Sequence, residues 1–323
     1  MVMIYGLIIA LGLVLGACSD DGDNAAGLVR DQSISTRSGQ TRYFDYYAPR
    51  SLEPKPAVVM IYHGGGGSAA ELQQDQAAQS HWFKIADDEG LLLLFPNGTN
   101  IQTGQTRGDS LNWNDCRIGP DTSAADDVGF SLALLDWAQS RFNADSRQIF
   151  LSGASNGGMM SMRMATEAAQ RVTAFASFIA SQPDPSECAQ PQVAVPALIL
   201  HGTADPLIPY AGGCIAGGDR GCVRSAGDTI ALWRDLHPVD PAQTQSVAFP
   251  DRTSSDDSRA SSRIYRDAQT QVRVQSITVR GGGHQIPSIE HRRNPALAQA
   301  LGPQNADIEA VELAWDFFAQ WRP

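Results

Sequence analysis

Lysine is nearly absent from this chain, which has only Lys55 and Lys84 among its 323 residues. Acidic residues outnumber basic ones by 35 to 24, so the formal net charge is −11 and the isoelectric point is about 4.9. No basic residues gather into a patch, which a protein needs to neutralise the phosphates of nucleic acid. We therefore expect no nucleic-acid partner and interpret the acidity as a solvated surface.

Linkers and repeats are also absent. No Pro-rich or Ser-rich segment divides the chain, and no internal repeat occurs. Because α/β domains often run beyond about 200 residues, we expect one domain. Strands that alternate with helices predict an α/β fold, with a mostly parallel central sheet covered by helices on both faces. We expect strands over 41–48 (antiparallel, at the sheet edge), 57–62, 91–95, 148–151, 175–180, 195–200 and 272–279, helices over 76–89, 128–142, 159–169, 229–236 and 307–321, and an exposed loop over 250–262.

Positive charge is missing from the first 17 residues, which are apolar and lead to Cys18 in the sequence LGAC. This length is short for a membrane span and suits the hydrophobic region of a signal peptide. The small residues before Cys18 resemble the lipobox of bacterial lipoproteins, in which the cysteine becomes the lipidated N-terminus. We expect residues 1–18 to be a lipoprotein-type signal segment, 19–38 a flexible tether and 39–323 a single α/β domain. The expected location is the outer face of a bacterial membrane; an ordinary cleaved signal and a periplasmic or extracellular protein are the alternative.

Cysteine is scarce, and no Cys-x-x-Cys or neighbouring histidine pattern indicates a zinc site. Besides Cys18 there are Cys116, Cys188, Cys214 and Cys222, an even number that is typical of an oxidising compartment. Cys214 and Cys222 flank the glycine-rich stretch IAGGDRG and would form a local disulfide, which leaves Cys116 to pair with Cys188. Four cysteines permit three pairings, and the sequence does not choose among them.

A glycine-flanked serine lies near the middle of the chain. The apolar stretch 148–151 leads into GASNG (153–157), which has the form Gly-x-Ser-x-Gly, and helical character follows. Strand, serine and helix in this order are typical of a nucleophile elbow. The turn is so tight that side chains at Gly153 and Gly157 would clash, which explains why both are glycine. Ser155 is the candidate nucleophile.

A serine hydroxyl needs a base within hydrogen-bond reach and an acid that orients the base. In α/β-hydrolases these residues occur in the order Ser, Asp or Glu, His, each in a loop after a strand. His284 comes last, after the strand 272–279 and within a glycine loop. The other histidines precede the acid, lie in or at the end of a helix, or follow no strand: His63, His201, His81, His237 and His291.

Asp205 is the candidate acid, because it follows the strand 195–200 and lies between Ser155 and His284 in the sequence. It would hold the tautomer of His284 and stabilise the imidazolium without taking the proton. The alternative acids belong to a polar segment into which no strand leads: Asp251, Asp256 and Asp257.

Ester or amide cleavage through a serine also needs two N–H donors for the developing oxyanion. The backbone of Asn156, directly after the nucleophile, is one candidate. The glycine run after the strand 57–62 supplies the other, which we assign to Gly65, with Gly64 or Gly66 as alternatives. The run lacks the Lys-Ser/Thr that follows in a P-loop, so a phosphate site is not expected.

Other notable residues have two interpretations each. Trp113 lies in the long loop 96–125 and either lines the substrate pocket or packs internally. Asp126 and Asp127 precede a predicted helix, where an N-cap explains them more simply than a Ca²⁺ site. The methionines of the segment 159–164 are expected to pack beneath the elbow.

With these residues in place, the chain resembles the polyhydroxybutyrate depolymerase/feruloyl esterase family of α/β-hydrolases, which is similar to carbohydrate esterase family 1. The matching segments are YHGGGGSA (62–69), LNWNDC (111–116), DDVGF (126–130), GASNGGMM (153–160), HGTADPLIPYAGG (201–213) and GGGH (281–284). The resemblance covers about 41 to the C-terminus and implies a secreted serine esterase with Ser155, Asp205 and His284 as its triad. Many members have Thr-Trp-Pro after the histidine, whereas this chain has Gln285-Ile286-Pro287, so its pocket is expected to differ.

The resemblance implies an ester substrate: a small ester, a hydroxyalkanoate oligomer or an acyl group linked to a polysaccharide. The chain ends soon after its last predicted helix, without the binding module of enzymes that attack solid polyester, so soluble esters are expected. We expect no metal or organic cofactor, and membrane contact only through an N-terminal lipid anchor. The alternatives are a peptidase or acyltransferase with the same triad, and a non-catalytic surface binding protein on an α/β-hydrolase scaffold.

Overall fold

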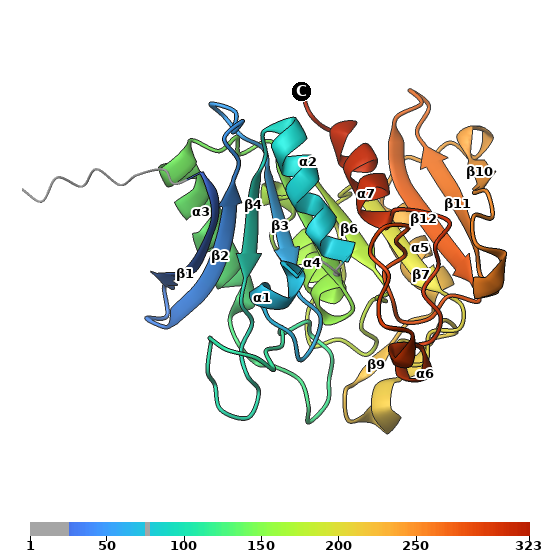
Figure 1. Ribbon diagram of the computed structural model, residues 1–323, viewed down its shortest axis with the longest axis horizontal. Helices are drawn as coiled ribbons and strands as arrows, with labels where there is room; N and C mark the ends of the chain where they lie inside the picture. Colours follow the sequence, from blue (N-terminus) through green and yellow to red (C-terminus); the bar gives the residue numbers. More distant parts are fainter. Residues whose placement is uncertain (1–25, 75–77) are drawn as a thin grey trace, which may run out of the picture.

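The computed structural model describes residues 26–74 and 78–323 of the chain. Its main feature is a ten-stranded sheet (Figure 1). The strands are β1 (Gly27–Ser35), β2 (Thr41–Ala48), β3 (Val58–Tyr62), β4 (Leu92–Pro96), β5 (Ile149–Ala154), β6 (Ala174–Phe178), β7 (Ala197–Gly202), β10 (Gln245–Ala248), β11 (Arg259–Arg266) and β12 (Val272–Arg280). A separate hairpin contains β8 (Gly213–Cys214) and β9 (Cys222–Val223).

The strand order is β1-β2-β4-β3-β5-β6-β7-β12-β11-β10. The six strands from β4 to β12 pair in parallel, and two antiparallel strands extend the sheet on each side. The parallel strands are short and apolar, and β3, β4 and β6 are buried at every position. Such strands need cover on both faces.

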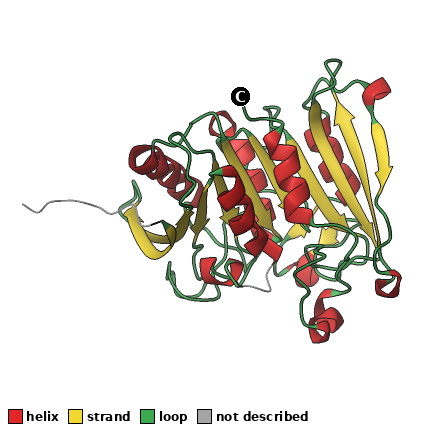
Figure 2. Ribbon diagram, turned by 45° about the horizontal axis from the view of Figure 1, so that its top comes forward, coloured by secondary structure: helices red, strands yellow, loops and turns green. Residues whose placement is uncertain are grey.

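Helices provide this cover. They are α1 (Ala69–Leu72), α2 (His81–Glu89), α3 (Asp127–Phe142), α4 (Asn156–Glu167), α5 (Ala226–Arg234), α6 (Ala298–Leu301) and α7 (Ala310–Ala319), with short 3₁₀ turns η1 (Ala78–Ser80), η2 (Ala169–Arg171), η3 (Ile215–Gly218), η4 (Pro241–Gln243), η5 (Ser254–Asp256) and η6 (Pro295–Leu297). Val58 and Met60 pack into one apolar layer with α3 and α4, whereas Val59 and Ile61 pack into the opposite layer with α2 and α7. Figure 2 shows helices on both sides of the sheet.

The predicted α/β architecture is therefore confirmed, but its edges differ from expectation. β1 lies within the segment 19–38 that the sequence predicts to be a tether, and it pairs with β2 along the edge of the sheet. β2 is antiparallel, as predicted, but is not the edge strand. β11 begins inside the predicted exposed loop 250–262, and it carries β10 on its outer side.

Asp126 and Asp127, the acidic pair at the start of α3, have different roles in the structure. The carboxylate of Asp126 accepts a hydrogen bond of 2.8 Å from the backbone N–H of Gly129, which makes it the expected N-cap. Asp127 instead forms a fully buried ion pair with Arg42 of β2 at 2.6 Å and accepts the backbone N–H of Asn114 at 2.7 Å. This pair fastens α3 to the sheet.

The signal segment 1–18, including Cys18, lies outside the described residues. Within the residues that are described, no helix has the length and apolar character that crossing a bilayer requires.

Candidate active site

Four loops that follow neighbouring parallel strands meet at one edge of the sheet. Gly64 to Gly67 follow β3, Ser155 follows β5, Asp205 follows β7 and His284 follows β12. Because the carboxyl ends of parallel strands lie at the same edge, residues far apart in the sequence come together there. The predicted candidates therefore share one site.

Ser155 lies at the turn between β5 and α4 with φ 56° and ψ −124°, a conformation that non-glycine residues rarely adopt. Its backbone N–H donates to the carbonyl of Phe178 at 2.9 Å, which helps to hold the turn. A Cβ on Gly153 would collide with the backbone of Gly157, and one on Gly157 would collide with the carbonyl of Tyr62. Both glycines are thus required by the close approach that the sequence predicted.

The three predicted triad residues form one hydrogen-bonded chain. His284 places Nε2 2.9 Å from Oγ of Ser155 and Nδ1 2.7 Å from Oδ2 of Asp205. The side chain of Asp205 is only 2% exposed, and its Oδ1 accepts hydrogen bonds of 2.8 Å from the backbone N–H groups of Leu207 and Ile208. This second pair of contacts fixes the carboxylate, so that its free oxygen faces the imidazole.

The loops that carry Asp205 and His284 are fastened to each other. The backbone N–H of Thr203 donates to the carbonyl of Val279, and that of Ala204 donates to the carbonyl of Gly282, both at 2.9 Å. The N–H of Gly281 donates to Oγ1 of Thr203 at 2.9 Å. The separation of acid and base is therefore set by the backbone.

The two residues predicted to supply oxyanion donors, Gly65 and Asn156, line the same cavity as Ser155. Gly65 lies beside Asn156, since a Cβ built on Gly65 would be 3.4 Å from the Cβ of Asn156. Within the described residues, the N–H of Gly65 has no hydrogen-bond partner, whereas that of Gly66 donates to the carbonyl of Leu111 at 2.9 Å. Asn156 is the first residue of α4, where an N–H has no partner inside the helix. The geometry thus favours Gly65 over Gly66 as the second N–H donor to the oxyanion.

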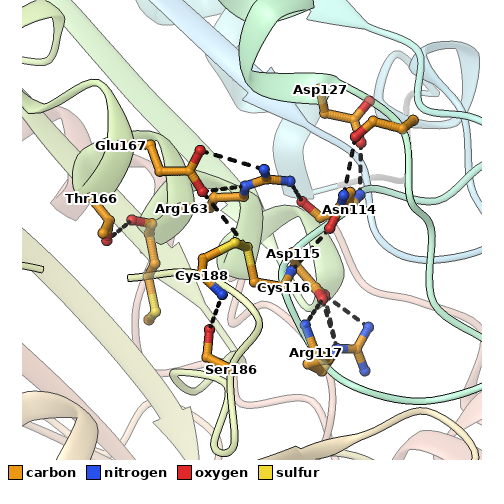
Figure 3. The surroundings of a disulfide bond; sticks show 12 residues. Asn114, Asp115, Cys116, Arg117, Asp127, Arg163, Thr166, Glu167, Ser186 and Cys188 are labelled. Carbon is orange, nitrogen blue, oxygen red and sulfur yellow. Dashed lines mark hydrogen bonds and ion pairs between the residues drawn. A yellow bond between two sulfur atoms is a disulfide. The ribbon is translucent and has the colours of Figure 1, made fainter. Parts of the chain in front are cut away.

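The side chain of Asn156 has a role that sequence reasoning missed. Its amide nitrogen donates to Oδ2 of Asp115 at 2.6 Å and to the carbonyl of Trp113 at 3.0 Å, and its oxygen accepts the N–H of Trp113 at 2.7 Å. Asp115 also pairs with Arg117 at 2.8 Å (Figure 3). These contacts fasten the elbow to the loop 111–117.

Both predicted disulfides are present in the structure. Cys116, next to Asp115, is bonded to Cys188 and links the loop 111–117 to the segment after β6 (Figure 3). Cys214 is bonded to Cys222 and closes the hairpin of β8 and β9. The first bond adds a covalent anchor to the loop that holds Asn156.

His63 supports the glycine loop instead of acting as the base. The backbone N–H of Gly98 donates to its Nε2 at 3.0 Å, so its Nδ1 must carry the proton that is shared with the carbonyl of Gly64 at 2.7 Å. Burial lowers the pKa of His63 to about 4. A neutral ring with a fixed tautomer therefore positions Gly64 and, next to it, Gly65.

A cavity of about 560 Å³ opens over Ser155 and His284. Apolar side chains line much of it: Ile179, Leu207, Ile208, Ile215, Ile286 and Leu301. Ile286 contributes to this wall at the position where the resemblance predicted an altered pocket. Trp113 does not line the cavity, so its pocket interpretation is corrected to packing: it is 1% exposed, and its Nε1 donates to the carbonyl of His63 at 2.9 Å.

The competing candidates have other partners. His201 is buried and lies 3.0 Å from Oγ of Ser181, and His237 lies 3.1 Å from the carbonyl of Val195. Asp251 pairs with Arg259 at 2.7 Å. None of these residues lines the cavity over Ser155.

Comparison with known proteins places the site in a family context. The model of the dienelactone hydrolase family matches residues 46–212, just over half of the chain. The chain is 27% identical over 295 residues to "Putative esterase NocK" of Nocardia uniformis subsp. tsuyamanensis, a match that covers 87% of this chain and 80% of that protein. It is 24% identical over 288 residues to the bifunctional acetylxylan esterase/xylanase XynS20E of Neocallimastix patriciarum, covering 88% of this chain but only 34% of that protein.

Among solved structures, an acetyl xylan esterase from Aspergillus awamori aligns with a TM-score of 0.57 and 15% sequence identity. The alignment covers 91% of this chain and 100% of that chain. At this identity the likeness concerns the fold, and it confirms the predicted α/β-hydrolase fold.

Proposed function

The chain belongs to the dienelactone hydrolase family and is a carboxylic ester hydrolase, and from this premise we propose that it cleaves esters through an acyl-enzyme on Ser155. The observation that carries the proposal is the hydrogen-bonded chain from Asp205 through His284 to Ser155, with links of 2.7 and 2.9 Å. Such a chain lets a serine hydroxyl act as a nucleophile near neutral pH.

In the first half-reaction, Oγ of Ser155 attacks the ester carbonyl carbon and its proton passes to Nε2 of His284. The N–H groups of Gly65 and Asn156 stabilise the negative charge that develops on the carbonyl oxygen. When the C–O bond breaks, His284 returns the proton to the leaving alcohol, and the acyl group stays on Ser155. Asp205 remains ionised and stabilises the imidazolium.

In the second half-reaction, a water molecule replaces the alcohol. His284 removes a proton from the water, which attacks the acyl carbonyl, and the second tetrahedral intermediate forms in the same donor pair. Collapse of this intermediate releases the acid and returns the proton from His284 to Ser155. Every proton transfer thus uses one nitrogen, Nε2.

The Ser155→Ala variant tests this mechanism. We expect turnover of p-nitrophenyl acetate to fall by about three or more orders of magnitude, because only binding and the N–H donors remain. A fluorophosphonate probe should label the wild-type protein and leave the variant unlabelled. Ser254→Ala, at an exposed serine, is the matched control and should retain full activity. Equal labelling of Ser155→Ala would contradict the acyl-enzyme on Ser155 and indicate another nucleophile, whereas a wild-type protein that is neither labelled nor active would favour the non-catalytic alternative.

We further propose that the substrate is a short acyl ester carried by a polysaccharide, such as an acetyl or feruloyl group. The name of the relative from Neocallimastix patriciarum supports this class, and a cavity of about 560 Å³ is large enough for an acyl group and part of a sugar. The kcat/KM values for acetylated xylan, methyl ferulate and hydroxybutyrate oligomers should be compared. A clear preference for hydroxybutyrate oligomers would instead support a polyhydroxybutyrate depolymerase-like activity.

Export to an oxidising compartment is a separate proposal, supported by the two disulfides and the apolar N-terminal sequence. We propose that Cys18 carries the lipid that tethers the enzyme to the membrane. In a bacterial host, labelled palmitate should enter the wild-type chain but not the Cys18→Ser variant. Incorporation into both chains would contradict lipidation at Cys18.

A further inference from the structure

A cluster of imidazole and carboxylate side chains lies outside the cavity, where α2, the loop after His284 and α7 come together. His81 is the first residue of α2, Glu290 and His291 belong to the loop, and Glu309 and Glu312 belong to the start of α7. One ligand atom each from His81, Glu290 and His291 lies within 4.8 Å of the others. We propose that this α2–α7 cluster binds one divalent transition-metal ion of the Zn²⁺ class.

His81 is oriented as a metal ligand. Its Nε2 lies 2.9 Å from Oε1 of Glu312, so in the neutral ring Nε2 carries the proton and donates it to the carboxylate. The lone pair of Nδ1 then faces two other carboxylates, with 3.8 Å to Oε2 of Glu290 and 3.9 Å to Oε1 of Glu309. A carboxylate that accepts the second N–H of a histidine is a common device for fixing the ring of a metal ligand.

Glu309 supplies an independent observation. Its side chain is 5% exposed, and Oε2 accepts hydrogen bonds of 2.9 Å from Oγ of Ser288 and the backbone N–H of Ile289. Oε1 is buried and has no hydrogen-bond partner within the described residues. Burying a carboxylate oxygen without a hydrogen-bond partner destabilises the folded protein. Oε1 points toward Nδ1 of His81, so an ion between them would satisfy both atoms.

The donor set selects the class of ion. Two imidazoles and one carboxylate, those of His81, His291 and Glu290, place their ligand atoms within 4.8 Å of one another, and Glu309 approaches this group through His81, with 3.9 Å between Oε1 and Nδ1. A mixed set of nitrogen and oxygen ligands suits Zn²⁺, whereas Ca²⁺ and Mg²⁺ prefer oxygen alone. Bonds of about 2.0–2.2 Å place the ligand atoms of a tetrahedral ion about 3.3–3.6 Å apart. The distances from Nδ1 of His81 to Glu290 and Glu309, 3.8 and 3.9 Å, are slightly longer, and the ligand atoms of His81, Glu290 and His291 lie within 4.8 Å of one another, so binding requires the side chains to close around the ion. The side chain of Glu290 is 67% exposed, which leaves it free to move inward.

The ion would have a structural role. Glu290 and His291 are the sixth and seventh residues after His284, so a metal that holds them to α2 and α7 would brace the loop that begins at the base. In Figure 1 α2 and α7 lie side by side on the front of the sheet, in agreement with their packing in one apolar layer. This inference is independent of the proposed ester chemistry.

Zinc binding to tag-free, EDTA-treated protein tests the inference. Calorimetry and elemental analysis should give one Zn²⁺ per chain, and saturating ZnCl₂ should raise the Tm by on the order of 5 °C. His291→Gln and Glu290→Gln should each weaken zinc binding by about tenfold or more, and His81→Gln should abolish it. Glu187→Gln removes an exposed carboxylate elsewhere and should bind like wild type.

Two further measurements keep the result decisive. His284→Ala should retain the zinc site, which excludes metal bound at the triad. If His81→Gln fails to fold by circular dichroism, the loop variants His291→Gln and Glu290→Gln decide. The proposal is overturned if these two variants bind zinc as tightly as wild type, if no stoichiometric zinc is bound, or if CaCl₂ or MgCl₂ stabilises the protein as well as ZnCl₂ does.

Discussion

At the level of single residues, the site depends on side chains that are fixed before any substrate arrives. Asp205 is held by two backbone N–H groups, and its remaining oxygen faces His284 at 2.7 Å. His63 is held between Gly98 and Gly64. Preorganised groups of this kind lower the cost of reaching the transition state.

Replacing Asp205 by Asn should therefore reduce activity without removing the fold. An amide at this position can donate to Nδ1 and favour the wrong tautomer of His284, so we expect kcat to fall by about three to four orders of magnitude. Steady-state kinetics with p-nitrophenyl acetate and circular dichroism measure the two effects. Asp251→Asn is the matched control, because Asp251 pairs with Arg259 away from the cavity. A kcat within tenfold of wild type would contradict the assignment.

Two buried histidines should make the free energy of unfolding depend on pH. Burial lowers the pKa of His63 and of His201 to about 4 each, below the ordinary value of 6.5. Between these values the unfolded chain binds more protons than the folded one, so the free energy of unfolding should fall as pH decreases from 6.5 to 4. Each histidine can contribute up to roughly 3 kcal/mol to this loss.

Urea unfolding of wild type and His63→Gln at several pH values between 7 and 4 tests this prediction. Glutamine can still accept from Gly98 and donate to Gly64 but does not titrate in this range. The variant should show a shallower pH dependence, by up to about 1.4 kcal/mol per pH unit. Equal slopes in the two proteins would contradict a neutral, buried His63.

At the level of elements, the sequence predicted the parallel strands well and the sheet edges poorly. The central strands are continuous apolar runs because both of their faces are covered, and such runs are visible in the sequence. β1 and β10 are mostly half-exposed or exposed, so their composition is similar to that of a loop. Their pairing depends on β2 and β11, a long-range contact that no local pattern encodes.

The same distinction applies to the site. The triad residues and the glycine loop each follow a strand. They could be recognised from the Gly-x-Ser-x-Gly motif, the glycine run and the order Ser, Asp, His along the chain. The hydrogen bond between Asn156 and Asp115 joins a helix to a distant loop, and the α2–α7 cluster likewise joins residues from different loops and helices. No local pattern in the sequence indicates either of them. His81 and Glu312 are 231 positions apart, and no spacing rule connects them.

The corrected N-terminal boundary can be tested by truncation. A chain that begins at residue 26 keeps β1, whereas one that begins at residue 39 exposes the edge of β2. The shorter chain also loses the ion pair of Arg107 with Asp31. We expect it to unfold at lower urea concentration and to aggregate more readily, because an unpaired edge invites association. Equal stability and solubility of the two chains would restore the interpretation of 19–38 as a tether.

At the level of the whole molecule, the disulfides connect stability to the active site. Cys116 and Cys188 are 72 positions apart, and Cys214 and Cys222 are 8 apart. Chain-entropy arguments give losses of about 4 and about 3 kcal/mol when each bond is removed. Cys116→Ala/Cys188→Ala should therefore be the less stable double variant, and its kcat should also fall, because Asp115 loses its anchor beside Asn156.

Cys214→Ala/Cys222→Ala is the comparison variant. Its hairpin reaches the loop 111–117 through the hydrogen bond of 2.8 Å from Arg117 to the carbonyl of Arg220, and Ile215 lines the cavity. Its kcat should fall less than that of Cys116→Ala/Cys188→Ala, because the bond from Cys116 to Cys188 adjoins Asp115 directly. Urea unfolding and steady-state kinetics of both double variants measure the two effects. An unchanged kcat in Cys116→Ala/Cys188→Ala would show that the remaining contacts of the loop are sufficient.

The bond between Cys116 and Cys188 also bears on when the enzyme becomes active. A newly made chain in a reducing cytoplasm would lack this bond, and the amide donor next to Ser155 would be held less firmly. With the export proposed above, full hydrolytic activity would arise only after the thiols are oxidised outside the cytoplasm.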